Sequence, residues 1–66
     1  MRLPLSLADR VLAVLPEFAS APLARDVAAR LNTDEPHVRQ AFDRLVNEGR
    51  AKTVRRGRGL HLVPLD

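Results

Sequence analysis

Five basic side chains lie close together near the carboxyl end of this 66-residue sequence. They are Arg50, Lys52, Arg55, Arg56 and Arg58. No acidic residue lies between residues 50 and 58, so nothing within the segment neutralises these cations. A cluster of this kind favours contact with a polyanion. The alternative is a flexible, solvated turn, and a GC-rich genome would explain the use of arginine over lysine but not the missing counter-charges.

A second set of polar side chains recurs along residues 34–48, where Val38, Ala41, Phe42 and Leu45 form an apolar stripe. If this segment is helical, the side away from the stripe presents Pro36, His37, Arg39, Gln40, Asp43 and Arg44. In the major groove of DNA, an amide can bind adenine, a guanidinium can bind guanine, and a carboxylate can accept from cytosine. The alternative is a solvated helix face on which Arg39 pairs with Asp43 at i, i+4.

The sequence shows no pattern typical of catalysis, metal binding or cofactor binding. His37 and His61 stand alone, without cysteine or a carboxylate cluster at metal-ligand spacing. His61 alternates with leucines on either side, so we expect it at the surface. The serines have no partners that would make them nucleophiles, and the late glycines do not precede a helix as in a nucleotide-binding loop. We therefore expect a non-enzymatic protein with no metal and no cofactor.

The spacing of apolar residues predicts three helices, over residues about 6–15, 22–31 and 34–48. Ser6 can cap the first helix, with Asp9 as its partner three residues later. Pro16 should end that helix, because the residue before a proline avoids the helical conformation. Phe18, the one large apolar residue of the connector, should enter the core.

The next two helices carry their own start and stop signals. Pro22 is expected to open the second helix, and Asn32 to end it in a left-handed conformation. Thr33 or Asp34 should cap the third helix, which Gly49 should terminate.

The last third of the chain changes from helical to strand-like periodicity. Residues 51–54 and 60–63 are rich in residues that favour extended chain, and residues 55–59 form a glycine-containing turn. A hairpin over residues 51–63 is therefore expected, with Pro64 ending its second strand.

Composition limits the protein to one small domain, residues 1–66. The chain has 11 Lys and Arg against 8 Asp and Glu, is 45% hydrophobic, and contains no cysteine. The missing cysteines exclude a disulfide framework and fit a reducing, cytoplasmic environment. No apolar run reaches the roughly 20 residues of a membrane span, and residues 1–10 lack the apolar stretch of a signal peptide.

The order of these elements resembles the winged helix-turn-helix family. The resemblance covers residues 23–62: LARDVAARLN is similar to the family's second helix, VRQAFDRLVNEGR to its recognition helix, and VRRGRGLHL to a basic wing. It implies a mostly α fold of three helices with a small β-hairpin.

The resemblance also implies sequence-specific binding to double-stranded DNA, as in a small transcriptional regulator or repressor that acts by occupying its site. The recognition helix would enter the major groove, and the wing would contact the backbone or minor groove. The DNA-binding residues would be Pro36, His37, Arg39, Gln40, Asp43, Arg44, Lys52, Arg55, Arg56 and Arg58. A homodimer would read enough base pairs for strong specificity, and the first helix or residues 63–65 could form its contact.

Other classes of partner remain open at this point. Residues 34–48 contain four acidic residues and two arginines, a balance that favours the alternative of a winged helix docking a protein partner through this helix. RNA binding by the wing is a third hypothesis, although the two phenylalanines are needed in the core and cannot stack on bases.

Overall fold

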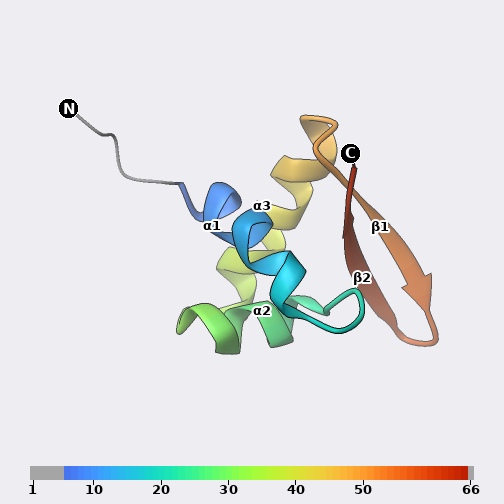
Figure 1. Ribbon diagram of the computed structural model, residues 1–66, viewed down its shortest axis with the longest axis horizontal. Helices are drawn as coiled ribbons and strands as arrows, with labels where there is room; N and C mark the ends of the chain where they lie inside the picture. Colours follow the sequence, from blue (N-terminus) through green and yellow to red (C-terminus); the bar gives the residue numbers. More distant parts are fainter. Residues whose placement is uncertain (1–5, 66) are drawn as a thin grey trace.

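The computed structural model describes residues 6–65 and places three helices ahead of an antiparallel hairpin (Figure 1). The helices are α1 (Leu7–Val14), α2 (Ala24–Leu31) and α3 (Glu35–Asn47), with the 3₁₀ helix η1 (Leu15–Glu17) directly after α1. The strands are β1 (Ala51–Arg56) and β2 (Gly59–Pro64). The predicted fold class is confirmed: the protein is mostly helical with a winged helix-like arrangement. The single domain expected over residues 1–66 includes residues 1–5 and 66, which lie outside the described residues.

α1 begins with the capping box that the sequence predicts. The Ser6 hydroxyl accepts from the Asp9 backbone N–H at 3.2 Å, and the Asp9 carboxylate accepts from the Ser6 N–H at 3.3 Å. Two of the N–H groups that lack helical partners are satisfied in this way. The regular helix ends at Val14, one residue earlier than expected, and Pro16 lies within η1 rather than outside the helical segment.

α2 begins later than the sequence predicts, because Pro22 takes part in a different interaction. Its carbonyl accepts from the Leu62 N–H at 3.0 Å, and Leu23 forms an isolated antiparallel bridge with His61. The helix starts at Ala24, and Asp26 accepts from the Leu23 N–H at 3.1 Å. Asn32 ends α2 with φ +56°, so the predicted left-handed stop is confirmed.

α3 is positioned by its two ends. Asp34 is the N-cap residue, but its side chain makes no capping hydrogen bond, so the predicted side-chain cap is wrong. At the other end Gly49 has φ +72°, and the N–H groups of Gly49 and Arg50 donate to Val46 and Leu45 carbonyls at 3.0 and 2.9 Å. These paired bonds are those of a Schellman motif, which turns the chain directly into β1.

The hairpin is longer and its turn tighter than predicted. Arg55 pairs with Leu60 and Arg56 with Gly59, so both arginines lie in β1 and the turn contains only Gly57 and Arg58. Gly57 has φ +59° while Arg58 does not have a positive φ. This is the pattern of a type II′ turn, in which glycine takes the first central position.

One apolar core joins the three helices to the hairpin. Its fully buried side chains are Val11, Val27, Val38, Leu45 and Leu62. Phe42, on the α3 stripe, is also buried, and Phe18 packs half-buried against the core as expected. Burying a Val, Leu or Phe side chain contributes about 1.5–3 kcal/mol, so this core is what holds α3 and the hairpin in fixed positions.

His61 is tied to the segment before α2, so its prediction as a surface residue was wrong. Its side chain is half-buried, and Nδ1 lies 2.7 Å from the Ala21 carbonyl oxygen. Because a carbonyl oxygen can only accept, Nδ1 carries a proton and donates. With the Leu62–Pro22 hydrogen bond, this contact ties the middle of β2 to residues 21–22.

Candidate nucleic-acid interface

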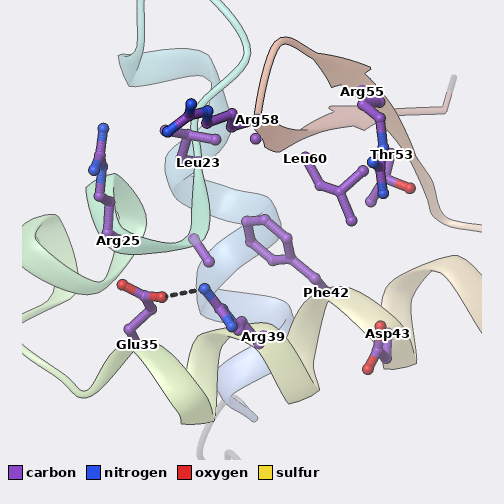
Figure 2. Close-up of a pocket in the computed structure, with 12 residues that line it drawn as sticks. Leu23, Arg25, Glu35, Arg39, Phe42, Asp43, Thr53, Arg55, Arg58 and Leu60 are labelled. Atoms are coloured by element: carbon purple, nitrogen blue, oxygen red, sulfur yellow. Dashed lines mark ion pairs between the residues drawn. The ribbon is translucent and has the colours of Figure 1, made fainter.

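An open groove of about 530 Å³ separates α3 from the hairpin, and the start of α2 closes one end. Phe42 lies at its centre in Figure 2, with Leu23 and Leu60 on either side of the ring. Gly59 allows the close approach of the hairpin, because a Cβ at this position would collide with the Leu23 side chain. The groove therefore has an apolar floor and two walls from elements far apart in sequence.

The walls of the groove are mainly cationic. Four arginines line it, against two carboxylates: Arg25, Arg39, Arg55 and Arg58, with Glu35 and Asp43. The structure thus brings together residues that the sequence analysis proposed separately, from the helix and from the hairpin. An excess of positive charge facing a concave, partly desolvated surface raises the local concentration of anions.

Arg25 was missed as a site residue. Nothing in the sequence singles it out, since it is one of several exposed charges on α2. The structure shows it on the groove wall, because the pairing of Leu23 with β2 directs the first turn of α2 toward the hairpin. Thr53 and Leu60 line the groove as well. Strand alternation from Arg55 could have identified Thr53, whereas Arg25 depends on the long-range pairing of residues 22–23 with β2.

The hairpin cations face two ways. Successive side chains of a strand point to opposite faces, so Arg55 lies on one face of β1 and Lys52 and Arg56 lie on the other. Arg55 and Arg58 line the groove. The expectation that three arginines share the hairpin tip is therefore wrong, since only Arg58 is in the turn.

The exposed face of α3 is divided in the same way. The candidates Pro36, His37, Arg39, Gln40, Asp43 and Arg44 are all exposed, as predicted. Arg39 and Asp43 face the groove, whereas His37, Gln40 and Arg44 line a shallower hollow of about 240 Å³ beside Leu7 at the start of α1. The polar face runs along α3, but only the side that carries Arg39 and Asp43 lines the same groove as Arg55 of β1.

Both arginines of α3 are held by carboxylates of the same helix or its cap. Arg39 Nη2 lies 2.6 Å from Glu35 Oε2, and Arg44 Nε lies 3.1 Å from Glu48 Oε2. The predicted Arg39–Asp43 pair is wrong: the partner of Arg39 is one turn earlier, not one turn later. Exposed pairs of this kind contribute little to stability, about 0.3–0.5 kcal/mol, so a stronger ligand could displace them.

Arg50 differs from the other members of the basic cluster. Its Nη1 lies 2.9 Å from Asp9 Oδ1 and 3.5 Å from Glu48 Oε1. The hydrogen bond from Arg50 lowers the pKa of Asp9, and the hydrogen bond from Arg44 is the main cause that lowers the pKa of Glu48. Arg50 is therefore a structural residue that joins the start of α1 to the start of β1.

The remaining hairpin cations have no carboxylate partner within residues 6–65. None of Lys52, Arg55, Arg56 and Arg58 takes part in an ion pair there, and all four are exposed. Folding thus leaves four of the five cations of the cluster free for an external anion.

Residues 6–65 offer neither a metal site nor a membrane-spanning helix. Among the described residues, no group of three or more His, Asp or Glu side chains could hold a metal ion. Within the same residues, no helix has the length and apolar character needed to cross a membrane. Comparison of the chain with protein-family models, with curated proteins and with solved structures found no match.

Proposed function

We propose that this protein binds double-stranded DNA sequence-specifically, with α3 in the major groove and the hairpin on the flanking backbone or minor groove. The observation that carries this proposal is a set of four exposed hairpin cations with no ion-pair partner within residues 6–65, beside the exposed polar face of α3. An isolated domain gains no stability from like charges held together, whereas phosphates would be neutralised by them.

The hairpin cations and the polar face of α3 would make different kinds of contact with DNA. Phosphate contacts fix the position of a protein on the duplex, and contacts with base edges read the sequence. The hairpin supplies cations, while α3 supplies an amide at Gln40 and a carboxylate at Asp43 that match adenine and cytosine. A domain of this size, acting in the cytoplasm as a regulator or repressor, would act by occupying its site. A homodimer would lengthen the sequence that it reads.

The decisive experiment is a salt titration of binding to a random 20-base-pair duplex pool, followed by fluorescence anisotropy. If Arg55, Arg58 and one of the two cations on the other face of β1 each neutralise one phosphate, log affinity should fall with log salt with a slope of about −2.7. Affinity should then drop roughly 40-fold between 50 and 200 mM salt. Absence of binding at 50 mM salt would contradict the proposal.

A second candidate function is docking of a protein partner through α3. It is favoured by the Glu35–Arg39 and Glu48–Arg44 pairs, because they leave little free positive charge on the helix. A protein that docks a partner through α3 would bind duplex DNA only through the hairpin cations and would prefer no sequence. Selection of a preferred site from a random duplex library therefore separates the two functions.

A further inference from the structure

The Glu35–Arg39 pair lies inside the groove rather than on an unrelated surface. Figure 2 shows the two side chains meeting on the α3 wall. Arg39 Nη2 and Glu35 Oε2 are 2.6 Å apart. The Glu35 side chain is 38% exposed and that of Arg39 is 70% exposed, so the carboxylate is the more enclosed member. Any phosphate that entered the groove to meet Arg39 would therefore meet Glu35 as well.

Asp43 provides an internal comparison. It lies one helical turn after Arg39 and lines the same groove, but it has no ion-pair partner within residues 6–65. The groove thus contains two α3 carboxylates of equal charge, and only Glu35 holds an arginine. The orientation has a physical cause, because an acid one turn before a base on a helix is more favourable than the reverse.

We propose that Glu35 competes with DNA for Arg39 and thereby weakens sequence-independent binding, an inference that rests on the proposed function. A carboxylate and a phosphate both accept from the same planar guanidinium fork, so Arg39 must leave one to bind the other. Once displaced, the Glu35 carboxylate still repels the phosphate that replaced it. Both effects oppose binding to a backbone of any sequence.

The competition acts unequally on different DNA sequences. A guanine placed opposite Arg39 offers two acceptors, O6 and N7, which compensate for the lost carboxylate. A site with another base at that position lacks this pair of acceptors, so Arg39 gains less there from leaving Glu35. Glu35 is therefore a specificity-determining residue: it makes Arg39 costly to recruit except at a site that engages the arginine fully.

The test compares Glu35→Gln with Asp43→Asn, which removes the same charge from the same groove without releasing an arginine. Affinity for the random 20-base-pair duplex pool is measured at 100 mM salt. Loss of one nearby like charge should raise affinity about twofold in either variant. Release of Arg39 should add about another twofold, so we expect about fourfold for Glu35→Gln and about twofold for Asp43→Asn.

An Arg39→Gln background shows whether the excess comes through the arginine. In that background the gain from Glu35→Gln should fall to the twofold gain of Asp43→Asn. Thermal melts followed by circular dichroism give the folded fraction of every variant, and affinities are compared per folded protein. The inference alone is overturned if the two charge-removing variants gain equally, or if the excess persists without Arg39. If the wild-type protein does not bind the pool, the proposed function fails and this inference fails with it.

Discussion

At the scale of single residues, Phe42 serves both the core and the groove. Its side chain is 4% exposed, and the small part of the ring that remains accessible lies at the groove floor. Residues one turn away on the same stripe, Val38 and Leu45, are fully buried. The aromatic ring therefore packs in the core and forms part of the groove floor.

Phe42→Ala should cost roughly 3–5 kcal/mol of unfolding free energy, because a buried aromatic ring is replaced by a cavity. That loss is comparable to the whole stability expected of a domain this small. Circular dichroism should show a largely unfolded protein at 25 °C. Val46→Ala is the control on the same helix, since Val46 is 39% exposed. A cooperative melt close to wild type for Phe42→Ala would contradict its place in the core.

Gln40→Ala should reduce discrimination between a site selected from a random duplex library and the random pool. The expected loss is roughly 1–3 kcal/mol, the value of a bidentate amide contact with adenine. Binding to the pool itself should change less, because Gln40 carries no charge. An unchanged ratio of the two affinities would indicate that α3 does not read bases, and would favour docking of a protein partner.

The sequence predicted those features of single residues that depend on neighbours three or four positions away. The Ser6–Asp9 capping box, the left-handed Asn32 and the stop at Gly49 all follow from local backbone chemistry, and all three predictions are confirmed. The partner of Arg39 was predicted wrongly, although the preference for an acid on the N-terminal side was available and points to Glu35. The sequence could not predict that His61 is half-buried, because its hydrogen-bond partner, Ala21, lies 40 residues away.

At the scale of elements, the hairpin separates its cations into two pairs of equal charge. Arg55 and Arg58 line the groove, whereas Lys52 and Arg56 lie on the opposite face of β1 or outside the groove lining. The sequence predicts the hairpin but places both strand arginines in the turn. The difference arises because a two-residue type II′ turn needs only Gly57 and Arg58, so the strands continue up to it.

This arrangement predicts unequal effects of two double substitutions. Arg55→Ala with Arg58→Ala should flatten the slope of log affinity against log salt by about 1.8, if each arginine contacts one phosphate. Lys52→Ala with Arg56→Ala removes the same charge and should flatten it by about 0.9 at most, since no more than one of these side chains would reach the backbone. All four positions are exposed, so melting curves should change little.

Each double substitution removes two positive charges, so a difference between the two slopes reports which face of the hairpin contacts DNA. Equal flattening by the two pairs would mean that the hairpin acts through net charge alone, without one face on the DNA. An unchanged slope in both would leave the basic cluster as a solvated turn. Replacing Arg55, Arg56 and Arg58 together should flatten the slope by about 2–3 if all three reach phosphates, and the two pairs show which of them do.

At the scale of the whole molecule, Asp9 and Arg50 join the two ends of the fold. They are 41 positions apart in sequence, yet Asp9 Oδ1 and Arg50 Nη1 lie 2.9 Å apart. Asp9 also accepts from the Ser6 hydroxyl at 2.9 Å, so one carboxylate caps α1 and anchors the residue that precedes β1. From the sequence, Asp9 is expected in the capping box of α1, and Arg50 in the basic cluster of residues 50–58. Nothing in local spacing could predict that they meet.

The Asp9 network predicts how stability depends on pH. The hydrogen bond from Arg50 lowers the pKa of Asp9 in the folded protein, while the unfolded chain keeps a value near 3.8. The unfolded state therefore binds a proton more readily. The stabilisation is fully present above pH 3.8 and is lost as the pH falls through the lowered pKa of the folded state. Glu48, whose pKa is lowered mainly by Arg44, adds a change of the same sign just below 4.5.

We expect the melting temperature to stay nearly constant from about pH 7 to pH 5 and to fall modestly below about pH 4, because solvent screens both exposed ion pairs. Asp9→Asn should lower the melting temperature at pH 7 and make its decline below pH 4 shallower, since the variant has no carboxylate to protonate at this position. Asp43→Asn is the control, because that carboxylate has no ion-pair partner within residues 6–65. Melts from pH 2.5 to pH 7 at low salt provide the measurement. If Asp9→Asn kept the wild-type pH profile, the Asp9–Arg50 contact would not be what couples α1 to the hairpin.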